Sequence, residues 1–159
     1  MERATLGELK TGDEARCAFC KIVRGEGESH AVFDDDVALA FLDRRPLLKG
    51  HCLLVPKQHL ETLDDLPAES IGSLFARVQV LARAVQRALA ADGHFVSINT
   101  RISQSVPHLH VHVVPRWKDD KLFSPKLIWR RRPYKDEAEM AQVRDAIREA
   151  VGEVQSEGR

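Results

Sequence analysis

The sequence lacks both a surplus of charge of one sign and any long apolar stretch. Its 24 basic residues balance 24 acidic ones, whereas a nucleic-acid-binding chain typically carries a clustered basic excess. No apolar run approaches the roughly 18 residues of a membrane-spanning helix. The charged N-terminus, MERATLGELKTGDEAR, has no apolar core of a signal peptide. We therefore expect a soluble, cytoplasmic protein whose partners include neither nucleic acid nor membrane.

Cysteine is also scarce, and its number is odd. Cys17, Cys20 and Cys52 are too few for a disulfide framework, and a reducing compartment disfavours any disulfide. Cys52 is expected to be a small buried hydrophobe. Cys17 and Cys20 form a Cys-x-x-Cys pair, but the βαβ context of a redox motif is absent. The pair is therefore either part of a structural metal site, which needs two further ligands, or two reduced core cysteines.

Apolar periodicity predicts an α+β fold with an antiparallel sheet of about five strands, one long helix and a C-terminal helix. The expected strands are 31–33, 37–43, 51–56, 95–99 and the segment from residue 108; the expected helices are 18–24, 67–91 and 135–151. A length of 159 residues suits one domain with tails. We expect a polar N-terminal tail at 1–16, a domain at 17–134, and a C-terminal helix and tail at 135–159.

The long helix has the clearest pattern. Pro67 is typical of a first helical turn, and Gly93 of a helix stop. Apolar residues recur at helical spacing and predict one core-facing stripe, which comprises Ile71, Leu74, Phe75, Val78, Leu81, Ala82, Val85, Ala88 and Leu89. The C-terminal helix has a similar stripe of Met140, Val143, Ile147, Ala150 and Val151.

The stretch QSVPHLHVHVVPR, residues 104–116, places His108, His110 and His112 at alternating positions. The residues that alternate with them are apolar, namely Leu109, Val111 and Val113. Successive side chains of a strand point to opposite faces, so the imidazoles share one face and the apolar residues anchor the other. Pro115 cannot donate to a strand ladder and is expected to end this strand.

Such a row of histidines has two chemical uses. A neutral imidazole attacks phosphorus while its neighbours handle protons. Alternate histidines on a strand also bind zinc in some enzymes, and exposed histidines without chemistry are the third alternative. The approach to the strand suits recognition of phosphate oxygens, because it carries hydroxyls, amides and a cation: Asn99, Thr100, Arg101, Ser103, Gln104 and Ser105.

This stretch resembles the signature of the histidine triad (HIT) family of nucleotide-binding proteins, His-φ-His-φ-His-φ-φ with φ apolar. The segments CAFCKIVRGE, VFDDDVALAFLD, KGHCLLVPKQH and SINT resemble the family in the same order, so the likeness covers residues 17–116. It implies a HIT-like fold and the zinc-containing, bacterial-type branch. It also implies an enzyme that cleaves a nucleotide phosphate through a nucleotidyl-histidine, with water completing turnover.

The resemblance assigns the catalytic residues. His110 is the nucleophile, and His112 contacts the scissile phosphate and assists the leaving group. His108 completes the triad, His51 supports the catalytic histidine, and Gln104 forms hydrogen bonds on the phosphate side. The implied substrate-binding residues are Asp43 at the ribose, Gln104, Asn99 and Ser105 at the phosphate, and Phe19, Ile22, Phe41 and Leu42 around the base.

The resemblance also supplies partners for the cysteine pair. Some family branches combine such cysteines with two histidines, which here are His59 and His108. The implied site holds a structural zinc that ties the N-terminal segment to the catalytic strand. His51 is the competing ligand.

The implied substrate is a purine nucleotide. Dinucleoside polyphosphates are favoured over purine nucleoside phosphoramidates, because the ending with Arg116 looks like the polyphosphate-cleaving bacterial members. A nucleotide phosphorylase, a nucleotidylyltransferase and a nucleotide-binding module with little turnover are the alternatives. The family usually pairs through its long helix and the adjoining strand, so we expect a homodimer.

The chain departs from the family in the loop NTRISQ, which is short and has no glycine. We hypothesise that Arg101 supplies a charge there that the glycine version lacks. The basic run Arg130–Arg132 is interpreted as a solvated face, with contact to a polyphosphate or a second nucleotide as the alternative. His30 and His94 match no motif and are expected at the surface.

Overall fold

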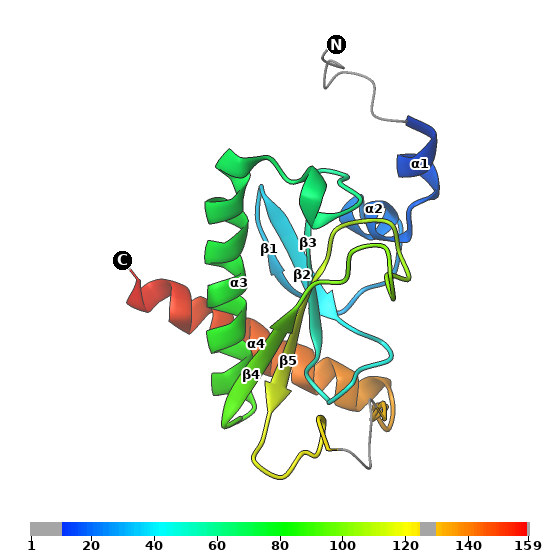
Figure 1. Cartoon of the computed structure of the whole chain (residues 1–159). Helices are drawn as coiled ribbons and strands as arrows, with labels where there is room; N and C mark the ends of the chain where they lie inside the picture. Colours follow the sequence, from blue (N-terminus) through cyan, green and yellow to red (C-terminus); the bar gives the residue numbers. More distant parts are fainter. Residues whose placement is uncertain (1–10, 125–129, 159) are drawn as a thin grey trace.

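The computed structural model describes residues 11–124 and 130–158. Residues 1–10, which begin the expected polar tail, lie outside the described residues, as do 125–129 and 159. In the described chain, five strands form one antiparallel sheet in the order β1-β2-β3-β5-β4, which confirms the α+β fold (Figure 1). The strands are β1 Ala31–Asp34, β2 Ala38–Leu42, β3 Cys52–Pro56, β4 Gly93–Ser97 and β5 Val111–Arg116. The helices are α1 Thr11–Arg16, α2 Ala18–Val23, the 3-10 helix η1 Leu63–Asp65, α3 Ala68–Ala88 and α4 Glu137–Glu157.

The two faces of the sheet are covered differently. The long helices α3 and α4 pack on one face and enclose the main core, which includes Leu54, Leu81 and Ile147 (Figure 1). The short helix α2 packs on the opposite face, where Phe19 joins Phe41 in a smaller apolar cluster. Burial of apolar side chains on both faces stabilises the sheet, and the shorter helix leaves room for a site on its own face.

Strand register decides which side chains point to which face. Phe41 pairs with Leu53, Leu53 with His112, and His112 with Ser97, so these four residues form a row across the sheet on the α2 face. The neighbouring row is Leu42, Cys52, Val113 and Val96, and it points into the core under α3 and α4. Leu109, Val111 and Val113 lie in that core, as the alternation predicts.

The histidine strand differs from its prediction at both ends. Regular pairing starts only at Val111, because Leu109 N–H donates instead to the Leu60 carbonyl outside the sheet, at 2.6 Å. Pro115 does not end the strand, which runs on to Arg116. Pairing of β5 with β3 stops at Val113, so at Pro115 the strand has a partner on one side only, where a missing N–H is tolerated.

The long helix is shorter than predicted. It ends at Ala88, and Ala90 makes the turn with a φ of 47°, so Gly93 is not the helix stop but the first residue of β4. Ile71 and Phe75 are 44% and 37% exposed, because the predicted stripe is wider than the surface that the sheet and α4 cover. The other stripe residues are buried or packed against the core.

The C-terminal helix is longer than predicted. The Asp136 side chain caps it by accepting from Glu139 N–H at 2.8 Å. The helix continues to Glu157 because Val154 is buried and Glu157 forms an ion pair with Arg87 at 2.7 Å. The buried side of the helix therefore contributes to the main core along most of its length, from Met140 to Val154.

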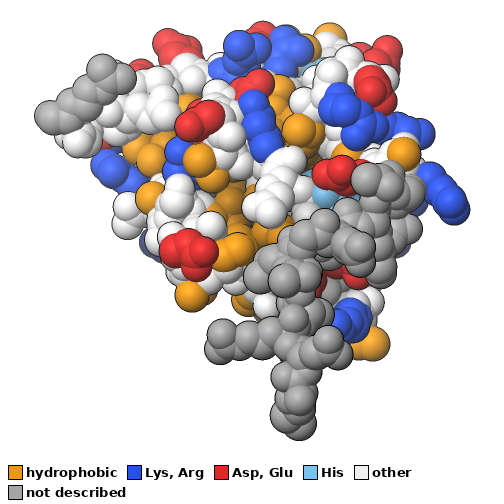
Figure 2. Space-filling model, turned by 90° about the horizontal axis from the view of Figure 1, so that it is seen from above, with side chains coloured by type: hydrophobic (Ala, Val, Ile, Leu, Met, Phe, Trp, Pro, Cys, Tyr) orange, Lys and Arg blue, Asp and Glu red, His pale blue; other side chains and the backbone are white. Residues whose placement is uncertain are grey.

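On the face shown in Figure 2, acidic and basic side chains are interspersed, as the balanced composition leads one to expect. None of the described helices combines the length and the apolarity needed to cross a bilayer.

Gly50 offers a test of this packing. Its φ is 95°, and an added Cβ would lie 2.2 Å from Leu89 Cδ1 and 3.3 Å from Pro115 Cγ. We expect Gly50→Ala to lower the free energy of unfolding by about 2 kcal/mol or more, through clash and a disfavoured backbone. Urea denaturation measures the change.

The matched control is Gly72→Ala in α3, where a Cβ would meet nothing within 4 Å. There the better helix propensity should raise stability by about 0.5–1 kcal/mol. Equal effects of the two variants would contradict the packing described around Gly50.

Candidate active site and metal centre

A cleft of about 770 Å³ opens on the α2 face of the sheet. Of the residues expected from the sequence, the cleft is lined by Phe19, Asp43, His51, Asn99, Ser105, His110 and His112. Ser103, which the sequence names among the polar residues before the histidine strand, lines it too, as does Arg131 of the basic run. Leu53, Ser97 and Val106 also line it and were not predicted. Strand pairing places Leu53 and Ser97 beside His112, although nothing in their local sequence marks them.

A backbone carbonyl fixes the protonation of His110. Nδ1 of His110 lies 2.7 Å from the His108 carbonyl oxygen, which can only accept, so Nδ1 carries the proton. The other ring nitrogen, Nε2, therefore keeps its lone pair. Burial lowers the pKa of His110 below its usual 6.5, which keeps the ring uncharged at neutral pH. His110 thus offers an unprotonated nitrogen on the wall of the cleft.

His112 carries its proton on the other ring nitrogen, Nε2. The Leu47 N–H donates to His51 Nδ1 at 3.2 Å, which assigns the His51 proton to Nε2. His51 Nε2 in turn donates to His112 Nδ1 at 2.9 Å, so His112 carries its proton on Nε2. That nitrogen is buried and has no hydrogen-bond partner in the described chain. His112 therefore presents a donor that lacks an acceptor beside the nucleophilic ring of His110, whose centroid is 4.9 Å away.

Asp43 is one of the residues that line the cleft. Its carboxylate accepts from Arg45 N–H at 2.8 Å and lies 3.5 Å from His51 Nδ1. Arg131 Nη1 approaches the same carboxylate at 3.9 Å and donates to the Arg45 carbonyl. Arg130–Arg132 are exposed, as the interpretation of a solvated face predicts, but Arg131 also lines the cleft, far from its own position in the sequence.

A second cluster lies behind the cleft. Cys17, Cys20, His59 and His108 each aim one potential ligand atom at a common centre, and these atoms lie within 4.8 Å of one another. His108 Nδ1 is 3.5 Å from Cys17 Sγ and 3.4 Å from Cys20 Sγ, while His59 Nδ1 is 3.1 Å from Cys20 Sγ. Tetrahedral zinc holds sulfur and nitrogen ligands roughly 3.5 Å apart. The spacing and the donor set both fit zinc.

The surroundings of this cluster also suit a cation. His108 Nε2 donates to the Pro56 carbonyl at 2.9 Å, which leaves Nδ1 free to act as a ligand. Burial and the neighbouring Cys17 raise the pKa of Cys20 to about 12, so a thiolate there needs a nearby positive charge. His51, the competing ligand, is not part of this cluster, because its ring forms a hydrogen bond with His112 in the cleft. In the described residues, no group of this kind includes His110 or His112.

Comparison with known proteins decides the family. Residues 24–119 match the HIT domain. The chain belongs to the histidine triad family.

Adenylylsulfatase HINT3 of Arabidopsis thaliana is 32% identical over 134 residues, which are 83% of this HIT chain and 68% of that protein. An uncharacterized HIT-like protein of Mycobacterium tuberculosis is 37% identical over 133 residues, or 82% and 92% of the two chains. Among solved structures, a Zn-bound histidine triad family protein from Mycobacterium smegmatis is 34% identical, with a TM-score of 0.78 and coverage of 90% and 98%.

Several residues expected at the base pocket lie elsewhere in this HIT protein. Leu42 points into the main core, because a step of one residue from Phe41 moves a side chain to the other face of the strand. Phe41 lies behind Phe19, with ring centroids 5.5 Å apart, and does not line the cleft. Ile22 packs against the same apolar cluster. The apolar lining of the cleft consists instead of Phe19, Leu47, Leu53, Phe95 and Val106.

Gln104 also lies away from the cleft. Its side-chain oxygen accepts from Arg101 N–H at 2.7 Å, and its nitrogen donates to the Glu61 carbonyl at 2.6 Å. Both ends of the amide therefore hold the loop. Because β5 begins only at Val111, only His112 of the three histidines lies within the strand, and Gln104 has no strand face to share with it. Ser103 and Ser105 line the cleft instead.

The short loop 99–104 is strained because it lacks glycine. Arg101 and Ser103 adopt left-handed φ values of 64° and 60°, which side-chain-bearing residues rarely adopt. Arg101 is exposed and does not line the cleft, so the structure gives no support to the charge expected from it.

Three other residues named in the sequence analysis lie outside both the cleft and the cysteine–histidine cluster. Cys52 is fully buried, as predicted, and His94 is exposed. His30 is not a free surface residue, since its side chain is 12% exposed and its Nε2 lies 2.9 Å from Glu137 Oε2.

The buried histidines of the cleft generate a pH dependence of stability. Burial lowers the pKa of His51, and it lowers the pKa of His112 from 6.5 to about 4. As the pH falls through about 6.5, these histidines take up protons in the unfolded chain but not in the folded one. The free energy of unfolding therefore has its full value above that pH and declines toward pH 4. We expect a loss of about 1–2 kcal/mol per group between pH 7 and pH 5.

Urea denaturation at the two pH values measures this loss. His112→Gln should show a smaller difference between pH 7 and pH 5 than the wild type, whereas the exposed control His94→Gln should keep the full difference. An unchanged difference in His112→Gln would show that His112 does not remain neutral in the folded state.

Proposed function

We propose that this HIT protein is a hydrolase that transfers a nucleotidyl group to water through a covalent bond to His110. The observation that carries the proposal is the hydrogen bond from His110 Nδ1–H to the His108 carbonyl, which leaves the Nε2 lone pair available in the cleft. Unprotonated imidazole is a nucleophile for phosphorus at neutral pH.

In the first step, His110 Nε2 forms a bond to the α-phosphorus while the bond from phosphorus to the leaving group breaks. For an anhydride substrate, His112 Nε2–H donates a hydrogen bond to the leaving oxygen, which departs as an anion. For a phosphoramidate, the leaving nitrogen takes up a proton from solvent and departs as an amine. In the second step, a water oxygen bonds to phosphorus, the phosphorus–nitrogen bond breaks, and the electron pair returns to Nε2. The proton released by water passes to solvent. The two displacements replace one difficult hydrolysis.

Substrate recognition is assigned to residues that line the cleft. We infer that Phe19, Leu53 and Val106 contact a purine base, and that Asp43 accepts hydrogen bonds from the ribose hydroxyls. Asn99 and Ser105 face the phosphate. The proposed substrates are dinucleoside polyphosphates or purine nucleoside phosphoramidates. The similarity to an adenylylsulfatase supports an adenylyl group as the part transferred.

We also propose the homodimer that the family resemblance implies. β4 is the last strand on one side of the described sheet, and an edge strand is a place where a second chain can add to a sheet. The exposed Ile71 and Phe75 on α3 add apolar surface that a partner chain would cover.

The covalent intermediate is the most direct test. Incubation with adenosine-labelled diadenosine polyphosphate and an alkaline quench should leave an acid-labile, phosphoramidate-linked label on the protein. His110→Ala should abolish the label and reduce turnover at least about 10³-fold, because the nucleophile is lost. His112→Ala should reduce kcat by about 10²–10⁴-fold and still form the label.

The rival functions give different results in the same experiment. A binding module without turnover would bind nucleotide and show no kinetic loss in His110→Ala. A zinc hydrolase that uses the triad as ligands would form no label and would lose activity at once on chelation.

We propose that Cys17, Cys20, His59 and His108 hold a structural zinc ion, which when bound neutralises the two thiolates and links α2 to the approach of β5. The Zn-bound relative supports this assignment. Protein purified without chelator should contain about one equivalent of zinc, and Cys17→Ala should lose it and melt at a lower temperature, because metal affinity contributes to folding.

Cys52→Ala is the matched control, since Cys52 is buried but lies outside the cluster. It should retain the metal. Less than about half an equivalent of zinc in the wild type would contradict the site.

A further inference from the structure

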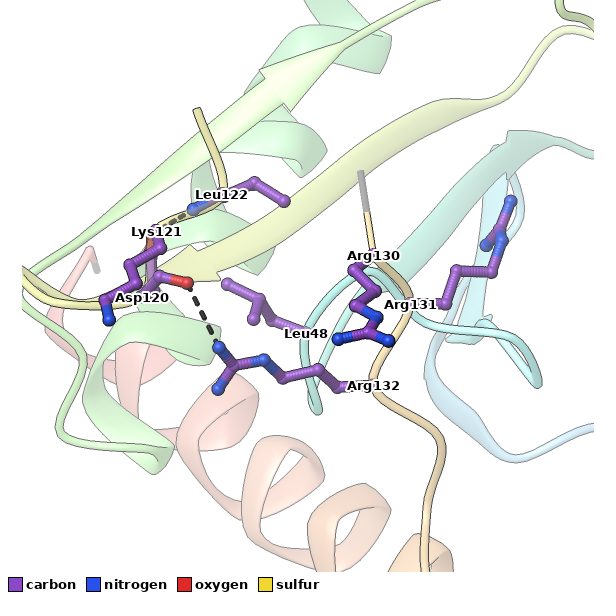
Figure 3. A pocket seen from close by; sticks show the side chains of 7 residues that line it. All are labelled: Leu48, Asp120, Lys121, Leu122, Arg130, Arg131 and Arg132. Atoms are coloured by element: carbon purple, nitrogen blue, oxygen red, sulfur yellow. Dashed lines mark hydrogen bonds between the residues drawn. The ribbon is translucent and has the colours of Figure 1, made fainter. Parts of the chain in front are cut away.

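A second cavity, of about 190 Å³, lies beside the cleft and is lined by Leu48, residues 120–122 and the run Arg130–Arg132 (Figure 3). Leu48 and Leu122 are buried and give it an apolar wall. The cavity exceeds several-fold the roughly 30 Å³ that a water molecule occupies in the liquid, which is enough for a phosphate group.

The cavity carries positive charge that its own carboxylate does not offset. Asp120 accepts from Arg116 through two hydrogen bonds of 2.5 and 2.9 Å, and from the backbone N–H groups of Trp117 and Leu122. These bonds hold the pKa of Asp120 at about 2, and its side chain is only 3% exposed. The Asp120 charge is thus matched by Arg116, which lies outside the lining.

The three cations that face the cavity keep their charge available. In the described part of the chain, no ion pair includes Lys121, Arg130 or Arg132. Arg132 donates only to a neutral group, the Asp120 carbonyl, at 3.3 Å. The planar guanidinium group of arginine has paired N–H donors and a positive charge, which match the oxygens of a phosphate in geometry and charge.

The run Arg130–Arg132 also connects the cavity with the cleft. The segment is extended, so Arg130 and Arg132 point to one side and Arg131 to the other (Figure 3). Arg132 N–H donates to the Pro46 carbonyl at 3.1 Å, which fixes the segment against the β2–β3 connection. Arg131 lines both cavities and approaches Asp43 in the cleft.

We propose that the cavity formed by Leu48, Lys121, Arg130 and Arg132 is a phosphate-binding site separate from the histidine cleft. Its ligand is a phosphate group, either free in solution or at the distal end of a polyphosphate whose α-phosphate lies at His110. The second source rests on the proposed function, whereas binding of free phosphate does not.

Binding is tested by titration with inorganic phosphate and with tripolyphosphate. The methyl signals of Leu48 and Leu122 in NMR spectra report whether the anion binds. Both anions should shift these signals. The double variant Arg130→Ala/Arg132→Ala should weaken the affinity at least about tenfold, and Lys121→Ala should weaken it by a smaller factor. Arg148→Ala, which removes an exposed arginine of α4, and His110→Ala should bind as the wild type does.

Unshifted Leu48 and Leu122 signals, or equal affinity in the double variant and in Arg148→Ala, would overturn the site. All the replaced arginines are exposed, so the variants should fold, and their thermal midpoints check this. The binding readout needs no turnover, so an inactive protein would contradict the proposed function and leave this test intact.

Kinetics then identify the source of the phosphate. If the distal end of a substrate occupies the site, the double variant should raise KM for diadenosine tetraphosphate and leave KM for adenosine phosphoramidate unchanged. Weakened phosphate binding without any change in KM supports the site as one for a free anion.

Discussion

The alternation of side chains across the sheet is the constraint on which the rest of the structure depends. The row Phe41, Leu53, His112 and Ser97 faces α2, and the next row faces the core. A slip of one residue in any of these strands would move its polar side chains into the core and its apolar ones into the cleft, at a cost of several buried side chains. Burial of the core row therefore also holds the site in register.

His108 joins the metal cluster to the cleft. Its ring lies among the thiols of Cys17 and Cys20, and its carbonyl oxygen accepts from His110 Nδ1–H. Both groups belong to one fully buried residue, so whatever fixes the ring also fixes the carbonyl that sets the proton position of His110. If the proposed zinc binds, it would also hold this carbonyl in place, since a ligand that is fixed orients its neighbours.

The zero net charge of the chain conceals a strong local contrast. The cleft histidines are buried or half-buried, and burial lowers their pKa values, while Arg44, Arg45 and Arg131 lie at the cleft lining and Arg130 and Arg132 at the neighbouring cavity. In the proposed reaction, an uncharged ring would keep its lone pair while the surrounding cations attract phosphate oxygens. Total charge bears on solubility and on nucleic-acid binding, but only the folded chain shows where the cations gather.

The sequence by itself determined the features that depend on near neighbours. Strand alternation and helical periodicity predicted the sheet and α3, and the histidine spacing drew attention to His110 and His112, which line one cleft although only His112 lies within β5. The Cys-x-x-Cys pair, together with the resemblance, predicted four side chains that the fold brings within 4.8 Å. The tertiary structure alone decided that Leu42 faces the core, that Gln104 forms hydrogen bonds within the loop and to Glu61, and that Arg131 lies close to Asp43. Those outcomes depend on register, loop closure and contacts between distant segments, which local patterns of residues do not encode.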